Sequence, residues 1–206
     1  EFYLVYAYIM CIYHGIYYIC NNLRFIMLLD GKKVYLKEFT TNHLNSDDYF
    51  RWLRDIDVIN TIGRDDYLLN TSKDEIFSYV NSILNSKNNC FFAIYEKNSN
   101  KFIGTQKIGH INWKFGTADL GIMIGDKSCW QKGYASETIT IAKNYAFDFL
   151  NLRKLTGGNA SHNIAMSKIF INCGFSEEGR LRKQGRINGN YYDLILYGLL
   201  VEDYRK

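Results

Sequence analysis

The stretch ADLGIMIGDKSCWQKGYASETITIAKNYAFDFL, residues 118–150, decides the fold. Its first part, Ala118 to Ile124, predicts a strand, and its last part, Ala135 to Leu150, predicts a helix with one apolar face. The loop between them enters the helix with small residues at Gly133 and Ala135. Unpaired N–H groups at a helix start converge at the positive end of its dipole, and small residues let an anion approach them. The pattern therefore predicts a diphosphate site, although a tight turn alone would also need small residues there.

The segments on either side of this stretch alternate between strands and helices. Strands are predicted at Lys33–Phe39, Cys90–Glu96, Lys101–Gly109, Lys154–Asn159, Phe175–Ile187 and Tyr191–Leu200, the last two joined by a hairpin turn. Helices are predicted at Leu44–Ile59, after the capping box of Ser72 and Glu75, and at Asn163–Cys173. The order β-α-α-β-β-β-α-β-α-β-β predicts an α/β (α+β) fold. It has about seven strands in a mixed, mainly antiparallel twisted sheet, with helices on both faces.

The amino-terminal region differs in composition from the rest of the 206-residue chain. Phe2 to Cys20 is almost entirely apolar or aromatic, and its length approaches that of a membrane span. No basic residue precedes this run, and its tyrosines favour an interface over a bilayer centre. We therefore predict an apolar extension over residues 1–26, with a membrane-associated segment as the alternative, and a single domain over residues 27–206.

Charge and cysteine content exclude several kinds of partner. The net charge of +4 is mild and the Lys and Arg residues are scattered, so no nucleic-acid partner is predicted. The cysteines stand at positions 11, 20, 90, 129 and 173, without CxxC spacing or a histidine pair at zinc-ligand spacing. This arrangement predicts no metal site, and it predicts reduced thiols in a cytoplasmic protein.

The loop at residues 130–136 differs from two common phosphate-binding motifs, because the chain has no GxxxxGK sequence and no GxGxxG that opens a helix. It resembles the pyrophosphate-binding loop of the GNAT superfamily of N-acetyltransferases. Gly133 and Ala135 match that loop, whereas Trp130 replaces Arg or Gln, as in the branch similar to ribosomal-protein alanine acetyltransferases. Asn163, with Gly174-Phe175 eleven and twelve residues later, keeps the spacing of a second motif of the superfamily. The resemblance covers nearly the whole chain from Met27 onward.

The resemblance implies that the protein binds acetyl-CoA. The diphosphate of coenzyme A would lie on the loop amides, and the pantetheine arm would run between two parallel strands that splay apart. Asn163 would cap its helix and contact the cofactor, or cap the helix only. The implied contacts of coenzyme A are Met123, Ile124, Trp130, Gln131, Lys132, Gly133, Tyr134, Ala135, Ser136, Asn163 and Phe170.

The implied reaction is attack of a neutral amine on the thioester, which needs a base, an oxyanion donor and a proton for the departing thiolate. The superfamily usually supplies that proton from a Tyr seven residues after the capping Asn, but this chain has Phe170 there, which cannot donate. Ser167, one helical turn earlier, is our candidate acid. His110 and Asp119 are candidate bases, and Asn159 is a candidate for holding a relay water. Each also has a purely structural interpretation, as a surface, core or strand-ending residue.

The acceptor is predicted from a second resemblance, near the carboxyl terminus. Residues 178–200 resemble the tail of acetyltransferases that modify nucleotide-linked (dTDP or UDP) amino-deoxy sugars for surface glycans such as the O-antigen of lipopolysaccharide. The side chains proposed to hold such a substrate are Trp113, Arg180, Arg182, Lys183 and Tyr192. The alternatives are a protein N-terminus or another small amine as acceptor, or a module that binds acyl-CoA without catalysis. The terminal hairpin also leads us to expect a homodimer.

Overall fold

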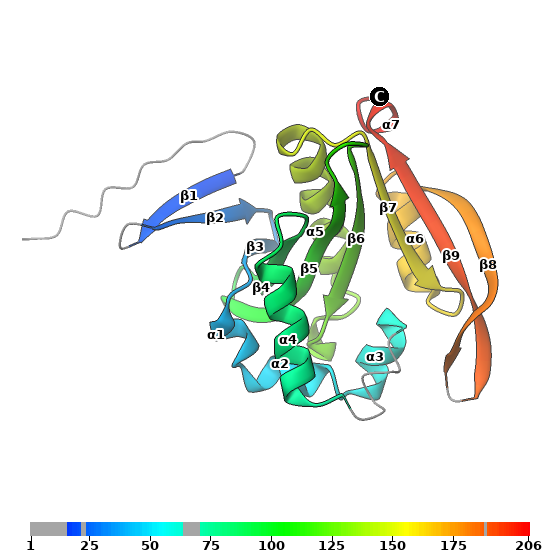
Figure 1. Cartoon of the computed structure of the whole chain (residues 1–206), viewed down its shortest axis with the longest axis horizontal. Helices are drawn as coiled ribbons and strands as arrows, with labels where there is room; N and C mark the ends of the chain where they lie inside the picture. The colour runs from blue at the N-terminus through cyan, green and yellow to red at the C-terminus, as the bar shows by residue number, and fades with distance from the viewer. Residues whose placement is uncertain (1–15, 22–23, 64–70, 188) are drawn as a thin grey trace, which may run out of the picture.

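The computed structural model describes residues 16–21, 24–63, 71–187 and 189–206. Within these ranges nine strands form one sheet in the order β1-β2-β3-β4-β5-β6-β7-β9-β8 (Figure 1). The β6–β7 pair is parallel and the other pairs are antiparallel, as the mainly antiparallel prediction requires. The strands are β1 Ile16–Asn21, β2 Arg24–Asp30, β3 Val34–Glu38, β4 Cys90–Glu96, β5 Lys101–Asn112, β6 Thr117–Ile124, β7 Lys154–Ala160, β8 Ser176–Ile187 and β9 Asn190–Leu200.

Helices cover both faces of the sheet, and each layer encloses its own apolar core. One face carries α1 Thr41–Leu44, α2 Asp47–Trp52, α3 Ile56–Ile62 and α4 Lys73–Leu84. The other carries α5 Tyr134–Asn144 and α6 Ile164–Asn172. Three short elements complete the described chain: η2 Lys127–Cys129, η3 Tyr145–Phe149 and α7 Val201–Tyr204. No helix in the described ranges combines the length and apolarity needed to cross a membrane.

Most predicted elements are confirmed because their signals are local. The capping box of Ser72 and Glu75 begins α4, and Gly174, with φ of 93°, follows the end of α6. The single helix predicted over Leu44–Ile59 is wrong, since this segment forms three short helices. Ser46 caps α2 by accepting from Asp48 N, and Asp55 caps α3 by accepting from Asp57 N. Each cap begins a new helix within a segment whose apolar spacing had predicted one continuous helix.

The β1–β2 hairpin extends the sheet beyond β3, and the sequence analysis did not predict it. The strand β2 pairs with β3 from Leu28↔Lys37 to Asp30↔Tyr35. It begins at Arg24 and ends at Asp30, so the proposed boundary between residues 26 and 27 falls inside a strand. A continuous apolar run does not by itself distinguish a strand from other apolar segments, and this explains why the hairpin was missed.

Three cysteines of the described residues lie in or against the core that is covered by α5 and α6. Cys129 and Cys173 are buried, Cys90 is half-buried, and all three are free thiols. Burial raises the pKa of Cys90 to about 11, so this side chain is a neutral thiol at neutral pH.

The parallel strands β6 and β7 diverge toward their carboxyl ends (Figure 1). Their pairing runs from Thr117↔Lys154 to Leu120↔Gly157 and ends there, although β6 continues to Ile124 and β7 to Ala160. The helix α3 contacts both strands near this point. The last residues of β6 therefore have an edge that faces β7 without pairing to it.

Candidate functional site

The unpaired end of β6 presents backbone groups toward β7. Gly125 N donates to Ile103 O at 2.9 Å, which makes residues 103 and 125 a hydrogen-bonded pair of the β5–β6 ladder. Such pairs alternate along an antiparallel ladder, so the backbone of Met123 bonds to β5 while the N–H and C=O groups of Ile122 and Ile124 point toward β7. Of the predicted backbone contacts, Met123 therefore faces β5 and Ile124 faces β7, and Ile122 faces β7 as well. The sequence analysis missed Ile122 because the direction of a backbone group depends on the pairing register.

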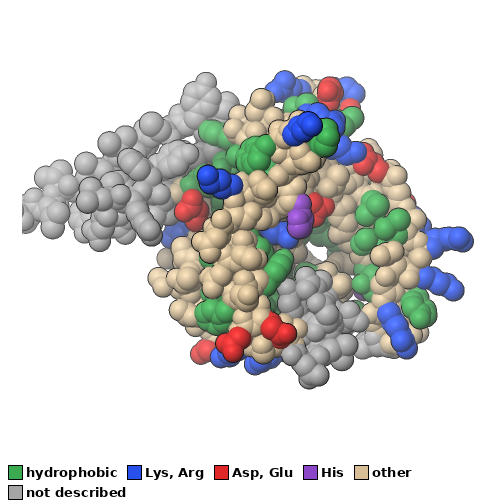
Figure 2. Space-filling view, in the orientation of Figure 1, with side chains coloured by type: hydrophobic (Ala, Val, Ile, Leu, Met, Phe, Trp, Pro, Cys, Tyr) green, Lys and Arg blue, Asp and Glu red, His purple; other side chains and the backbone are tan. Residues whose placement is uncertain are grey.

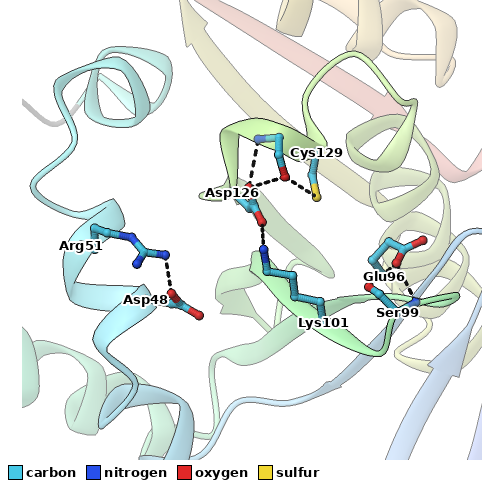
Figure 3. Close-up of polar contacts among 8 residues, drawn as sticks. Asp48, Arg51, Glu96, Ser99, Lys101, Asp126 and Cys129 are labelled. Atoms are coloured by element: carbon cyan, nitrogen blue, oxygen red, sulfur yellow. Dashed lines mark hydrogen bonds and ion pairs between the residues drawn. The ribbon is translucent and has the colours of Figure 1, made fainter.

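The loop after β6 is anchored at its first residues (Figure 3). Asp126 accepts a hydrogen bond from Ser128 N and forms an ion pair with Lys101 of β5, with 2.5 Å between Nζ and Oδ2. Trp130 Nε1 donates to Ile124 O at 2.8 Å, so the indole holds the loop against the end of β6. These contacts determine where the loop enters α5.

The helix α5 begins without a side-chain cap. Gln131 and Gly133 have positive φ angles of 61° and 83°, and Gly133 is the N-cap residue. The N–H groups of Tyr134, Ala135 and Ser136 consequently have no intrahelical acceptor, and they point outward along the helix dipole. A diphosphate fits this position, as the sequence analysis expected.

The side chains of the same loop are mostly turned toward the protein or toward solvent. Tyr134 donates its hydroxyl to Glu96 Oε1 at 3.2 Å, and Ser136 Oγ lies 3.7 Å from Cys173 Sγ. Lys132 is exposed. The loop thus offers its backbone, more than its side chains, to an anion.

Asn159, Asn163 and Ser167 form one hydrogen-bonded group where β7 meets α6. Asn163 Oδ1 accepts from Met166 N at 3.1 Å, which confirms the predicted cap, and its Nδ2 donates to Thr61 O at 3.0 Å. Asn159 is buried, and its Nδ2 donates to Ser167 Oγ at 3.0 Å. The Ser167 hydroxyl in turn donates to Asn163 O over a long 3.4 Å, so an anionic acceptor beside it would compete for this hydrogen. Asn159 Oδ1 is buried without a hydrogen-bond partner among the described residues.

Phe170 lies in the core beneath the opening. Its ring is 1% exposed and stacks on Tyr197 with 4.9 Å between centroids. A Cβ added to Gly157 would lie 2.6 Å from Phe170 Cζ, and Gly157 is the last β7 residue paired with β6. A ligand in the opening would meet Gly157 before it reached this ring. Phe170, which was predicted to contact the cofactor, is therefore a buried core residue in this structure.

A small apolar pocket of about 140 Å³ adjoins the unpaired end of β6, on the face covered by α2, α3 and α4. Lys107 supplies the single charged side chain among its described lining residues. The Lys107 ammonium lies 3.4 Å from the Tyr79 hydroxyl. The pocket is lined by Tyr49, Leu53, Ile62, Tyr79, Ile83, Phe91, Thr105, Lys107, Gly121, Ile122 and Met123.

Asp119 lies on the same face of β6 as Gly121 and Met123, which line the pocket. It precedes Gly121 by two residues. Its Oδ1 accepts a hydrogen bond from Thr156 Oγ1 at 3.0 Å, across the parallel β6–β7 pair. Burial raises the pKa of Asp119 above its ordinary value, while the Thr156 hydrogen bond and the charge of Lys107 oppose this rise. A carboxylate with a raised pKa beside a pocket is suited to accept a proton at neutral pH.

His110 and Trp113 line a different hollow, on the turn side of the β5–β6 hairpin. His110 is exposed, has φ of 52° at an irregular point of the ladder, and donates its N–H to Asn89 Oδ1 at 3.1 Å. Trp113, 52% exposed, follows on the turn that leads into Thr117, the first residue of β6. The β6–β7 opening lies at the other end of β6, so Trp113 is remote from it.

The other predicted substrate contacts lie on the terminal hairpin. Figure 2 shows Lys and Arg side chains projecting from this outer edge of the sheet. Arg180 lies 3.5 Å from Asp193 and pairs with Glu177 of its own strand, and Arg182 and Lys183 follow on β8. Tyr192, on β9, packs edge-on against His162. These four predicted residues therefore do not converge on one pocket with Trp113.

Similarity to known proteins covers most of the chain. Residues 33–176 match the family model described as Acetyltransferase (GNAT) domain. The spermidine N(1)-acetyltransferase of Vibrio cholerae serotype O1 is 30% identical over 133 residues, which are 65% of this chain and 76% of that protein. The N-acetyltransferase p20 of Bacillus licheniformis is 30% identical over 113 residues, 55% of this chain, and the match spans only 63% of its length.

A solved structure has the same fold. The spermidine N-acetyltransferase from Vibrio cholerae, in complex with CoA and spermine, superposes with a TM-score of 0.76 and 23% identity, over 85% of this chain and 100% of that one. The predicted branch also has a match, since the ribosomal-protein alanine N-acetyltransferase of Escherichia coli (strain K12) is 25% identical over 116 residues, 55% of this chain and 59% of that protein. Both predicted motifs lie within the residues that the family model matches. The chain therefore belongs to the acetyltransferase (GNAT) domain family, the N-acetyltransferases that use acetyl-CoA as donor.

Proposed function

We propose that this protein transfers the acetyl group of acetyl-CoA to the primary amine of a small molecule. One observation carries the proposal, namely the junction at the unpaired end of β6. There the edge formed by Ile122 and Ile124 lies beside the apolar pocket, which Ile122 helps to line, and Asp119 precedes the lining residue Gly121 by two positions on the same strand. The acetyl donor and the amine would thus both contact β6, the strand that also carries the proposed base.

Acetyl-CoA supplies the activated acetyl thioester when it is bound. The N–H groups of Tyr134, Ala135 and Ser136 fit its diphosphate. The N–H and C=O groups of Ile122 and the N–H group of Ile124 are suited to the amides of an extended pantetheine arm, which pair as a strand would, whereas Ile124 O already accepts from Trp130 Nε1. An N–H group on this edge is also suited to stabilise the oxyanion that forms when the amine attacks.

Asp119 is the proposed base. An amine arrives in water as an ammonium ion and must lose a proton before it can attack the thioester. Asp119 would accept this proton directly or through one water, and the hydrogen bond from Thr156 orients its carboxylate. His110, the other candidate, lines a separate hollow and is assigned no proton transfer here.

Ser167 is the proposed donor to the departing thiolate, oriented by Asn159. Replacing Ser167 with Ala is expected to lower kcat about 10- to 100-fold, since a hydrogen bond to a charged group is lost in the transition state. Affinity for CoA should stay within about 2-fold, because the backbone contacts remain. Steady-state kinetics with thiol detection measures kcat, and calorimetry measures affinity.

The matched control is Ser82→Ala on α4, because the Ser82 hydroxyl bonds only to Tyr79 O in the described structure and lies on another helix. An unchanged kcat in Ser167→Ala would remove Ser167 from the mechanism.

The described pocket lining favours an amine attached to a mostly apolar body. A polyamine is the second candidate, supported by the spermidine acetyltransferases that this chain is similar to. The Lys107 ammonium would repel a second positive charge within the pocket. A nucleotide-linked amino sugar has less support, because the cations predicted to bind its diphosphate lie on the outer edge. The homodimer and the cytoplasmic location stay predictions.

A CoA-release assay over a panel of amines tests the proposal. The panel contains alkyl and arylalkyl monoamines, spermidine, a peptide with a free N-terminus, and dTDP- and UDP-linked amino sugars. We expect the highest kcat/KM with a monoamine. The highest kcat/KM with spermidine would favour the second candidate, and turnover with peptides alone would overturn both. Calorimetric CoA binding without turnover of any amine would indicate a non-catalytic module.

A further inference from the structure

The β2–β3 turn, residues 30–33, is docked onto the first turn of α5. Glu137 of α5 accepts hydrogen bonds through Oε1 from Lys32 N and from Lys33 N, the latter at 2.8 Å. The approach is close, because a Cβ added to Gly31 would lie 2.8 Å from Ile141 Cδ1. Two segments about 100 residues apart in sequence are therefore held together beside the start of α5.

The same turn is also held by Lys97, the residue that follows β4. Lys97 Nζ donates to Gly31 O at 2.8 Å and pairs with Asp30 at 2.9 Å. Lys97 N donates to Lys33 O at 2.8 Å. The backbone of the turn is thus held by contacts from two elements, and this fixes the point from which the Lys33 side chain starts.

The Lys33 ammonium lies on the loop that precedes α5. Its Nζ donates to Lys132 O at 3.1 Å and would lie 3.4 Å from a Cβ on Gly133. Among the described residues, no carboxylate lies within ion-pair distance of this ammonium. The nearby Glu137 carboxylate accepts from the backbone N–H groups of the turn. The ammonium and the first N–H groups of α5 therefore adjoin the same residue, Gly133.

We propose that Lys33 is a cofactor-binding residue that contacts the diphosphate of coenzyme A. The inference rests on the proposed function for the identity of the ligand. The N–H groups at the helix start carry only partial charge, Trp130 stands where the resemblance expects Arg or Gln, and the loop's own cation, Lys132, is exposed, so a second full positive charge beside Gly133 would strengthen the site. Lys33 supplies that charge from a different part of the sheet. Glu137 acts as its positioning residue, since it docks the turn.

The test is calorimetric binding of CoA and of dephospho-CoA, which lacks the 3′-phosphate but keeps the diphosphate. Replacing Lys33 with Ala is expected to raise the Kd of both ligands about 10- to 100-fold and by the same factor, as loss of a charge-assisted hydrogen bond requires. Lys33→Arg should restore most of the affinity. The matched control is Lys32→Ala, since Lys32 belongs to the same turn, is exposed, and has no side-chain contact in the described structure.

Each alternative result has one meaning. A loss confined to CoA would assign Lys33 to the 3′-phosphate and overturn the diphosphate contact. An equal Kd for wild type and Lys33→Ala, or an equal loss in Lys32→Ala, would overturn the assignment of Lys33. Failure of the wild-type protein to bind CoA would instead contradict the proposed function itself.

Discussion

Replacing Asp119 with Asn is expected to lower kcat by about 100- to 1,000-fold, the range for loss of a positioned general base. Asn keeps the shape of the side chain and the hydrogen bond from Thr156, but it cannot accept a proton. Affinity for CoA should stay close to that of the wild type, because Asp119 lies outside the proposed donor contacts. Steady-state kinetics over a pH range measures the effect.

The pH profile distinguishes a base from a structural carboxylate. Burial raises the pKa of Asp119, and a base must be deprotonated, so wild-type kcat/KM should fall as pH decreases through that raised pKa. This acid limb should be absent in Asp119→Asn. Thr156→Val removes a hydrogen bond that lowers the Asp119 pKa, so it should move the limb to higher pH. Lys107 and His110 also act on this carboxylate, and His110→Ala is the control for a competing base.

Stability supplies an independent check on the same variant. A carboxyl whose pKa is raised by folding binds its proton more tightly in the folded state, so folding is penalised once pH exceeds the unfolded pKa. At pH 7 Asp119→Asn removes this penalty, and its Tm should equal or exceed that of the wild type. An activity loss that came with a lower Tm would point to misfolding and contradict the role as base.

Replacing Gly125 with Ala is expected to destabilise the fold by about 3 kcal/mol, the upper end of the cost of overpacking a core. A Cβ at this position would lie 2.0 Å from Trp52 Cδ2, and Trp52 is 3% exposed and packed on Phe102. Because the indole is buried against Phe102, it can move away only by displacing other core side chains. Thermal unfolding should show Tm lowered by roughly 6–12 °C for a chain of this size.

The matched control for Gly125→Ala is Gly121→Ala, four residues earlier and within β6, the strand that Gly125 directly follows. A Cβ on Gly121 would have its nearest neighbour, an atom of Lys107, at 3.9 Å, which is ordinary contact. Its Tm should therefore change little. Equal Tm values for the two variants would show that the end of β6 does not pack against α2 as described.

Several features could be predicted from the sequence because they depend on residues close together in the chain. The strand, loop and helix of residues 118–150 were predicted from periodicity and from the small residues at the helix start. Asn163 was predicted to cap α6, since a capping oxygen and the backbone N–H that donates to it lie three residues apart. The spacing from Asn163 to Gly174-Phe175 then indicated the family, because two motifs in order are more specific than either alone.

The arrangement of the site was decided only by the tertiary structure. Asp119 meets Thr156, and Asn159 meets Ser167, through the β6–β7 register and the docking of α6, and no single segment contains that information. Register also made Ile122 face β7, and the docking of α6 placed the Phe170 ring in the core. Local pattern determines which elements form. The tertiary structure decides which side chains and backbone groups line the same opening. This depends on the residue at which the pairing of β6 and β7 ends, and packing over the whole sheet determines that residue.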